Sequence, residues 1–435
     1  MKKLGMLALA AVMVVMFTIP AWAIESEFGG YWRTRMYTNQ NFTGEDETEL
    51  RDATLVDTRT RLYYTAVFHE NLKFVNKFEF DTSWGGGTLG DIGADGKELE
   101  IKNSYIDANT GPVNWKVGIQ GARLARGFLF DDDFSGMQVA YKGETFEVPF
   151  IWVKAFEGTI AGFGNVQDGN DLDMDYYGLF PKFTVGDMVT LNPYALYVYS
   201  KDAAGAQNKY GYLFPSGDLG LFEEDEVNTW FVGIDADVTF EMATLWFTGI
   251  YQGGEVDIKF QDDSADISAW LAAIGGAFNV GMFDIHGQGF YASGDDDFTD
   301  DDWEEFTPPP GRSYYWAEIM GLGIFDNQAS ANAPADNISN VWAANLGTTI
   351  KPMDKLKVTL DVWYASLVEN DALEGDDELG TEVDLIITYE IVQNLNLDLV
   401  GAYLFAGDAT TRSNEALSVD DADPYEVGAR LSLSF

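Results

Sequence analysis

The chain contains no cysteine and only two histidines, His69 and His286, among its 435 residues. The missing thiols exclude disulfides, iron–sulfur clusters, thiolate metal sites and cysteine nucleophiles. They also exclude covalent haem attachment, because the C-x-x-C-H motif needs two cysteines. Two histidines leave little material for histidine-based metal sites or catalytic triads. We therefore expect no enzyme activity, no metal and no cofactor.

Basic residues are also scarce, with 26 lysines and arginines against 71 aspartates and glutamates and a formal net charge of −45. Because a nucleic acid partner needs a cationic surface, we expect none. Beyond residue 23 the chain has no apolar run long enough for a membrane-spanning helix. A hydrophobic content of 46% and an aromatic content of 14% nevertheless indicate a folded protein rather than a disordered one.

Residues 1–23 have the pattern of a secretory signal peptide. Two lysines precede an apolar run over residues 4–19, and the segment ends in Ala21-Trp22-Ala23. Small residues at these positions predict cleavage after Ala23. The alternative is an uncleaved membrane anchor, which would have a longer apolar core. Residues 24–435 then form one domain.

Within that domain, apolar and polar residues alternate over segments of about ten to fourteen residues. Residues 72–81 (LKFVNKFEFD), 356–364 (LKVTLDVWY) and 381–390 (TEVDLIITYE) are examples. This period of two is typical of β-strands with one apolar face, whereas helices would space their apolar residues three and four apart. The sequence therefore predicts an all-β fold.

Connections of two lengths separate the strands. Tight ones such as residues 69–71 and 392–394 alternate with long, acidic, glycine-rich ones such as residues 202–227 and 295–338. This order predicts a transmembrane, up-and-down, antiparallel β-barrel of about 18 strands, with short periplasmic turns and long extracellular loops. A soluble sandwich would have shorter strands and would not sort its loops by length.

The two ends of residues 24–435 resemble those of Gram-negative outer-membrane β-barrel porins. Residues 425–435 alternate to the last residue and end in Phe435, and residues 28–37 form an aromatic-rich first strand. Arg59-Thr60-Arg61 and residues 127–136 (GFLFDDDFSG) give a closer resemblance to the eighteen-stranded porins related to the alginate-export family. The resemblance implies a water-filled passive diffusion channel in the cell outer membrane for ions and small hydrophilic solutes. It also implies that Phe435 is an insertion signal.

Charged strand faces should point into the barrel, because an arginine that faces lipid costs about 2–4 kcal/mol at the midplane. A barrel of this size has an aqueous lumen that keeps such charges hydrated. The charges either simply keep the wall wet or form a basic wall opposite an acidic one that orients solutes. The expected pore-lining residues are Arg33, Arg35, Arg59, Arg61, Lys73, Lys77, Asp235, Asp237, Glu382 and Asp384.

Two loops are candidates for entering the barrel. Residues 123–134 are the third long loop, which the porins that the chain resembles fold inward as a constriction; the alternative is an ordinary surface loop. Residues 295–338 are the longest loop and contain an apolar stretch, residues 314–320, that should not lie bare in water. We expect that stretch to pack into the mouth or against a neighbour. The constriction candidates are Arg123, Arg126, Asp131, Asp132 and Asp133.

The expected partners are outer-membrane lipids, lipopolysaccharide, the barrel-insertion machinery and small hydrophilic solutes, with a homotrimer left open. Three alternative functions also remain: the sheath of a multihaem cytochrome conduit, a polysaccharide-export porin and an outer-membrane barrel enzyme. Asp284 and His286 share one strand face and are the sole arrangement that resembles a catalytic pair. A hydrogen-bonded lumen histidine is the structural alternative for that pair.

Overall fold

The computed structural model describes residues 24–46, 52–86, 90, 92, 99–156, 173–200, 224–258, 263–297, 302–370, 377–412 and 419–435. The predicted signal peptide, residues 1–23, lies outside the described residues, so its cleavage stays a prediction. The described chain is almost entirely β-structure. None of its few helical turns has the length and apolarity needed to cross a membrane.

The strands follow one another along the chain with one 3-10 turn, η2 (Ala125–Gly127), and one helical turn, α3 (Asp408–Thr411). In the first half they are β1 (Glu25–Gln40), β2 (Ala53–His69), β3 (Leu72–Ser83), β4 (Glu100–Thr110), β5 (Val113–Leu124), β6 (Phe130–Lys142), β7 (Phe146–Phe156), β8 (Met174–Leu179), β9 (Lys182–Val185) and β10 (Val189–Ser200). In the second half they are β11 (Glu224–Thr239), β12 (Ala243–Ile258), β13 (Asp263–Val280), β14 (Phe283–Ala292), β15 (Asp302–Trp303), β16 (Val341–Met353), β17 (Leu356–Leu367), β18 (Glu378–Val392), β19 (Leu395–Ala406) and β20 (Tyr425–Ser434).

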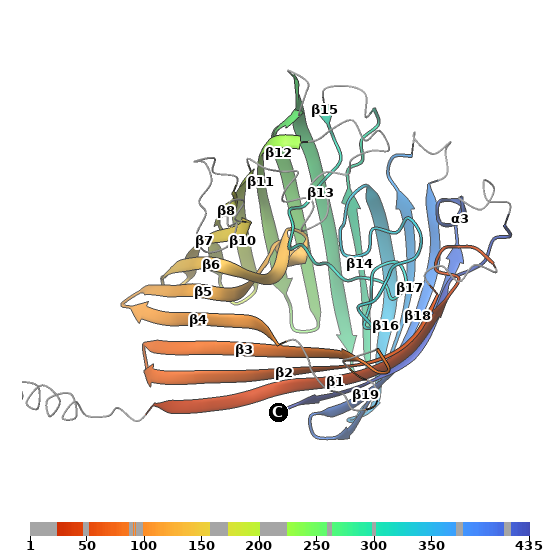
Figure 1. Ribbon diagram of the computed structural model, residues 1–435, viewed down its shortest axis with the longest axis horizontal. Helices are drawn as coiled ribbons and strands as arrows, with labels where there is room; N and C mark the ends of the chain where they lie inside the picture. The colour runs from red at the N-terminus through yellow and green to blue at the C-terminus, as the bar shows by residue number, and fades with distance from the viewer. Residues whose placement is uncertain are drawn as a thin grey trace, which may run out of the picture.

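These strands form a closed antiparallel barrel. Each barrel strand pairs with the next one along the chain, and β1 pairs with β20 to complete the ring (Figure 1). β8 and β9 both pair with β7 and β10, so they are one barrel strand interrupted at Phe180-Pro181, where proline lacks the N–H that a ladder needs. β15 is a two-residue strand beside β13 and stands outside the ring. The described residues thus confirm the predicted barrel of eighteen strands.

Tight turns join alternate strand pairs at one end of the barrel, at the lower and left edges of the view in Figure 1. Gly111, Gly186 and Gly281 occupy three of these turns with φ of +62°, +62° and +63°. This left-handed conformation favours glycine, because a side chain would collide with the backbone. The short connections predicted from the sequence therefore lie together at one rim.

The outer face of the barrel is apolar, as a lipid-facing surface must be. Leu62, Val117, Ile274, Leu346 and Leu399 are between 42% and 68% exposed. Exposed aromatic side chains lie near the strand ends on both rims. They include Trp230, Trp342 and Tyr403 toward the long connections, and Phe240 and Phe278 beside the tight turns. Such aromatic girdles flank the hydrocarbon band of outer-membrane barrels.

The carboxyl terminus closes the ring against the first strand. The backbone N–H of Phe435 donates to the carbonyl of Gly30 over 3.1 Å, and the N–H of Gly30 donates to the carbonyl of Phe435 over 2.7 Å. The ring of Phe435 occupies the space where a side chain at position 30 would lie, since a Cβ built there comes within 2.5 Å of its Cζ. Glycine at position 30 therefore makes room for the terminal aromatic ring.

Deleting Phe435 should lower the amount of heat-modifiable barrel in the outer membrane, because the closing strand loses both its last hydrogen bonds and the expected insertion signal. Phe405→Ala is the matched control, since it removes a 55% exposed aromatic ring from β19 and leaves the terminus intact. Gel mobility of heated and unheated membranes measures the folded fraction. Equal folded fractions of the deletion and the control would contradict the assigned role of Phe435.

Candidate functional site

The connection between β5 and β6 is much shorter than predicted. β5 ends at Leu124 and β6 begins at Phe130, so the expected loop over residues 123–134 is wrong and residues 125–129 alone join the strands. The acidic residues Asp131, Asp132 and Asp133 pair with Arg123, Ala122 and Gly121 as rungs of the ladder. In this antiparallel ladder the backbone N–H and carbonyl groups of the two strands hydrogen-bond to each other, so the sheet continues through the acidic segment.

This short connection is nevertheless folded into the barrel. Arg126 has φ of +58°, and its side chain spans the interior to β11 and β12. There the guanidinium donates to Asp237 Oδ1 over 2.8 Å and to Thr248 Oγ1 over 3.0 Å, and it lies 4.9 Å from the ring centre of Trp246. Asp235 lies beside it and accepts from the Thr248 hydroxyl over 2.7 Å. Two of the expected pore-lining carboxylates thus meet one of the expected constriction residues.

The long connection between β14 and β16 also lies inside the barrel, and we call residues 304–340 the interior loop (Figure 1). The backbone N–H groups of Ile319 and Met320 donate to the Glu382 carboxylate over 2.6 and 2.9 Å. The N–H of Glu318 donates to Asp384 Oδ2 over 3.4 Å. Glu382 and Asp384 are only 0% and 3% exposed, so they lie in the interior beneath the loop and anchor it.

The same loop also contacts β1 and β20, the two strands that close the barrel. Phe325 stacks on Tyr37 of β1 with ring centres 5.1 Å apart. Arg430 of β20 donates to the carbonyl of Ile324 over 3.3 Å, and Arg35 of β1 donates to the carbonyl of Asp326 over 3.5 Å. The interior loop is therefore fixed at β18 on one side and at β1 and β20 on the other.

Aromatic side chains link the two segments that fold into the barrel, residues 125–129 and the interior loop. Tyr314 stacks on Phe128 with centres 3.8 Å apart, and Phe290 packs edge-on against Tyr314 and Trp316 at 5.9 and 5.3 Å. Trp316 in turn packs edge-on against Trp363 at 5.2 Å. The expectation that residues 314–320 pack inward therefore agrees with their contacts. A barrel of this size would otherwise hold water, but here the loop occupies much of the lumen beside β12 to β18 and leaves a cavity of about 360 Å³.

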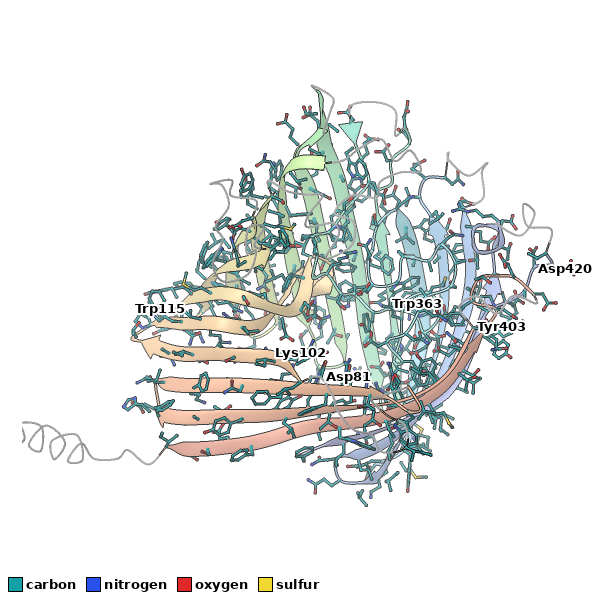
Figure 2. All side chains as sticks on the ribbon, in the orientation of Figure 1. Asp81, Lys102, Trp115, Trp363, Tyr403 and Asp420 are labelled. Carbon is teal, nitrogen blue, oxygen red and sulfur yellow. The ribbon has the colours of Figure 1, made fainter. Side chains whose placement is uncertain are left out.

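The other side of the lumen carries basic side chains from β1 to β4 and β20, and we call this set the cationic wall. Arg33 faces Arg59 across β1 and β2, and Arg35 faces Arg430 across β1 and β20. Figure 2 places Lys102 and Asp81 on this side of the barrel. The cationic wall comprises Arg33, Arg35, Arg59, Arg61, Lys77, Lys102 and Arg430.

Carboxylates on neighbouring strands pair with this wall. Arg59 donates to Asp81 over 2.5 to 3.1 Å, Arg61 donates to Glu79, and Arg35 donates to Asp57 over 2.7 Å. These charge-assisted bonds fix the directions of long side chains that would otherwise be mobile. The wall is therefore a set of held cations alternating with carboxylates rather than a bare row of positive charges.

Sequence reasoning missed Lys102 and Arg430 as wall residues. Lys102 Nζ lies 3.7 Å from Glu79 Oε1, and Arg430 Nη2 lies 2.9 Å from Asp398 Oδ2. Arg430 stands in the alternating terminal strand, so its inward face was readable from the sequence. The expected lining residue Lys73 lies further toward the β2–β3 turn, opposite Asp107 of β4.

In the described part of the barrel, two cavities are lined by several residues of the cationic wall, and a third, of about 480 Å³ beside β4 to β8, meets the wall at Lys102. One of about 330 Å³ is lined by Arg33, Arg35 and Arg59 together with Asp57 and Asp81. A second of about 620 Å³ is lined by basic and acidic side chains from the wall, from β6 and from the interior loop. Its charged lining residues are Arg61, Lys77, Lys102, Arg123, Arg312, Asp131, Asp132, Asp133 and Asp336. The open space of the interior is thus bordered by both signs of charge.

His286 is held between two carboxylates. Its Nδ1 lies 2.8 Å from Asp284 Oδ1, and its Nε2 lies 3.0 Å from Asp361 Oδ1. Because both ring nitrogens are engaged, neither is available as a general base for a substrate. The geometry favours the hydrogen-bonded lumen histidine over the catalytic pair considered from the sequence.

Comparisons with known proteins agree with this architecture. The family model described as "Alginate export" matches residues 25–420. No curated protein resembles the chain closely enough to count as a match. Similar solved structures share the fold at low identity. They include the outer membrane protein OpdK from Pseudomonas aeruginosa, with 10% identity, TM-score 0.56 and coverage of 94% of this chain and 99% of that one. They also include OccAB4 from Acinetobacter baumannii and OccK8 (OprE) from Pseudomonas aeruginosa, each with 11% identity, TM-score 0.57 and coverage of 94% and 98%.

Two independent observations thus converge. The eighteen-stranded ring with an apolar outer face is the architecture of outer-membrane porins. The family model spans nearly all of the described barrel. The chain therefore belongs to the alginate export family and has the fold of an outer-membrane porin.

Proposed function

We propose that the chain is a passive diffusion channel of the Gram-negative outer membrane, through which ions and small hydrophilic solutes pass along the cationic wall. The observation that carries this proposal is the division of the barrel interior. The interior loop packs against β12 to β18 and leaves a cavity of about 360 Å³ there, whereas cavities of about 620, 480 and 330 Å³ border residues of the cationic wall. A polar, charged passage inside an apolar outer surface is what diffusion of hydrophilic solutes requires.

The charge pattern supports weak ion selectivity. Acidic connections give the chain a net charge of −45, which attracts cations to the mouth. Those charges are screened within about 8–10 Å at physiological salt. The cationic wall opposes them from inside the barrel, where the narrow space focuses its field. We expect a small cation preference at low salt that fades as salt rises.

The location and partners follow from the same account. Residues 1–23 direct export, and the insertion machinery then reads Phe435 as the barrel folds into the outer membrane. Lipids and lipopolysaccharide cover the apolar outer face, and a homotrimer would use part of that face. Catalysis forms no part of the proposal, because the described interior offers His286 only with both ring nitrogens engaged.

The geometry of the interior disfavours two alternative functions, a cytochrome sheath and a polysaccharide-export porin. A sheath around a multihaem cytochrome would need an empty lumen, but the interior loop and residues 125–129 occupy much of it. Export of a polysaccharide chain would need both residues 125–129 and the interior loop to move out of the lumen. The charged cavities along the wall match small solutes in size.

Currents across planar lipid bilayers test the proposal. Refolded residues 24–435 should produce discrete, ohmic conductance steps with a small cation preference at about 0.1 M salt that is lost at about 1 M. Heated, unfolded protein from the same preparation is the control. A heat-modifiable barrel that gives no steps would contradict the channel. Copurification of a haem protein would favour the sheath instead.

A further inference from the structure

A group of carboxylates lies buried in the interior without basic partners. Glu318, Glu382, Asp384 and Glu426 are at most 6% exposed. Within the described residues, none of them lies within 4.0 Å of a lysine, arginine or histidine nitrogen. Arg430 is committed to Asp398 instead. Burying unpaired charge is costly, and burial raises the pKa of Glu318 to about 7.

A cavity of about 360 Å³ adjoins two of these carboxylates, between the interior loop and strands β12 to β18. Trp246, Trp316 and Trp363 line it together with Glu318, Asp361 and Asp384. Figure 2 shows Trp363 on the side of the barrel away from Lys102 and the cationic wall. His286 also lines the cavity and is bonded to Asp361. The cavity therefore combines aromatic rings with two acidic groups that have no basic partner among the described residues, Glu318 and Asp384.

One of its acidic oxygens lacks a partner. Asp384 Oδ1 is buried and has no partner among the N–H donors of the described residues, while Oδ2 accepts the long 3.4 Å bond from the N–H of Glu318. The Asp384 carboxyl also shares a side-chain hydrogen bond with Glu382. Leaving a buried acceptor unsatisfied costs about 1–3 kcal/mol, and more when it is charged. Because Asp384 is 3% exposed and lines the cavity, a ligand with an N–H donor is the group that would satisfy this oxygen.

We propose that this cavity binds a small organic cation, with a primary ammonium group on Asp384 and a carbon body against the tryptophan rings. The rings attract cations through their electron-rich faces, and Trp246 already holds the Arg126 guanidinium at 4.9 Å. A neutral solute would leave the carboxylates uncompensated, and an anion would be repelled. The described residues contain no group of three or more histidine, aspartate or glutamate side chains placed to hold a metal ion.

The site rests on the proposed function, since solutes reach it through the channel, but its test measures binding without transport. Isothermal titration of refolded wild-type protein compares benzylammonium, benzyl alcohol and benzoate, which share one ring and differ in charge. Benzylammonium should bind at least about tenfold more tightly than either of the others. Benzyl alcohol binding as tightly, or no heat with benzylammonium at about 10 mM, would overturn the proposal. Conductance of the same preparation reports separately on the channel.

Two variants locate the site. Asp384→Asn keeps an oxygen that accepts from Glu318 but removes the charge, and it should weaken benzylammonium about tenfold. Asp107→Asn makes the same change on β4 and should leave the affinity unaltered. Trp316 belongs to the interior loop rather than to the barrel wall, so Trp316→Leu should not disturb the strands. It should weaken benzylammonium binding about fivefold. If Asp384→Asn fails to fold, Trp316→Leu decides the question, and full affinity in that variant would overturn the site.

Discussion

Replacing residues 314–331 by a short glycine–serine linker should raise the single-channel conductance several-fold. These residues occupy much of the lumen beside β12 to β18, and Tyr314, Ile319 and Met320 are buried there. The barrel wall is complete without them, because every barrel strand pairs with its neighbours through the ladder. The deletion should therefore widen the water-filled section and leave the ring closed. Planar-bilayer recordings give the conductance, and gel heat-modifiability shows that the barrel has folded.

A second variant separates loop anchoring from loop volume. Glu382→Gln with Asp384→Asn keeps the full loop, but the amide introduced at position 382 presents an NH2 group where a carboxylate accepted from both Ile319 and Met320. Each lost acceptor for a buried N–H costs about 1–3 kcal/mol, so the loop should detach intermittently. We expect brief openings to the conductance of the deletion variant. A folded deletion variant with wild-type conductance would show that the interior loop does not restrict the path.

Replacing Arg59 and Arg61 by serine should shift the zero-current potential toward cation selectivity. The two arginines pair with Asp81 and Glu79, so their removal takes away positive charge and frees two carboxylates on the same wall. The loss of positive charge and the release of the two carboxylates both favour cations over anions. The cation-to-anion permeability ratio should rise about threefold at low salt. Reversal potentials in a salt gradient measure the ratio.

The matched control removes positive charge at the tight-turn rim. Lys142 lies at the end of β6 with its side chain 53% exposed, where water and salt screen it. Lys142→Ser should leave the reversal potential near the wild-type value. If the double arginine variant folded and kept both conductance and reversal potential, these arginines would not line the path. The inward register of β2 would then have to be abandoned.

The barrel was predictable because lipid imposes a simple rule on the strands. Charged faces must turn inward, and alternation therefore assigns Arg59 and Arg61 to the interior from the sequence alone. The rule fails beyond the bilayer, where strands continue without an apolar face. β11 begins at Glu224, so the last residues of the expected loop over residues 202–227 are strand. Asp131, Asp132 and Asp133 escaped prediction as strand for the same reason.

The interior contacts were harder to predict than the strands. The apolar residues 314–320 indicate burial. Their sequence does not identify Glu382 as their hydrogen-bond acceptor, because Glu382 is 63 residues from Ile319 in sequence. Such pairs depend on which strands the loop passes, and the loop path is set by long-range packing. Lys102 was missed because it is itself the extra residue of a bulge in β4: Lys77 pairs with Asn103 and Phe78 pairs with Ile101, which shifts the β3–β4 register. A period of two cannot be followed through such a shift.

The most direct test of the central claim uses the absence of native cysteine. Arg61→Cys and Leu62→Cys place single thiols on adjacent residues of β2, one on the cationic wall and one on the lipid-facing surface, where Leu62 is 42% exposed. An anionic, water-soluble thiol reagent is added while a single channel is recorded. If solutes pass along the cationic wall, labelling should change the conductance in a discrete step for the cysteine at position 61 and should leave it unchanged for the cysteine at position 62. An unchanged current at position 61, with labelling verified by mass, would contradict permeation along the cationic wall.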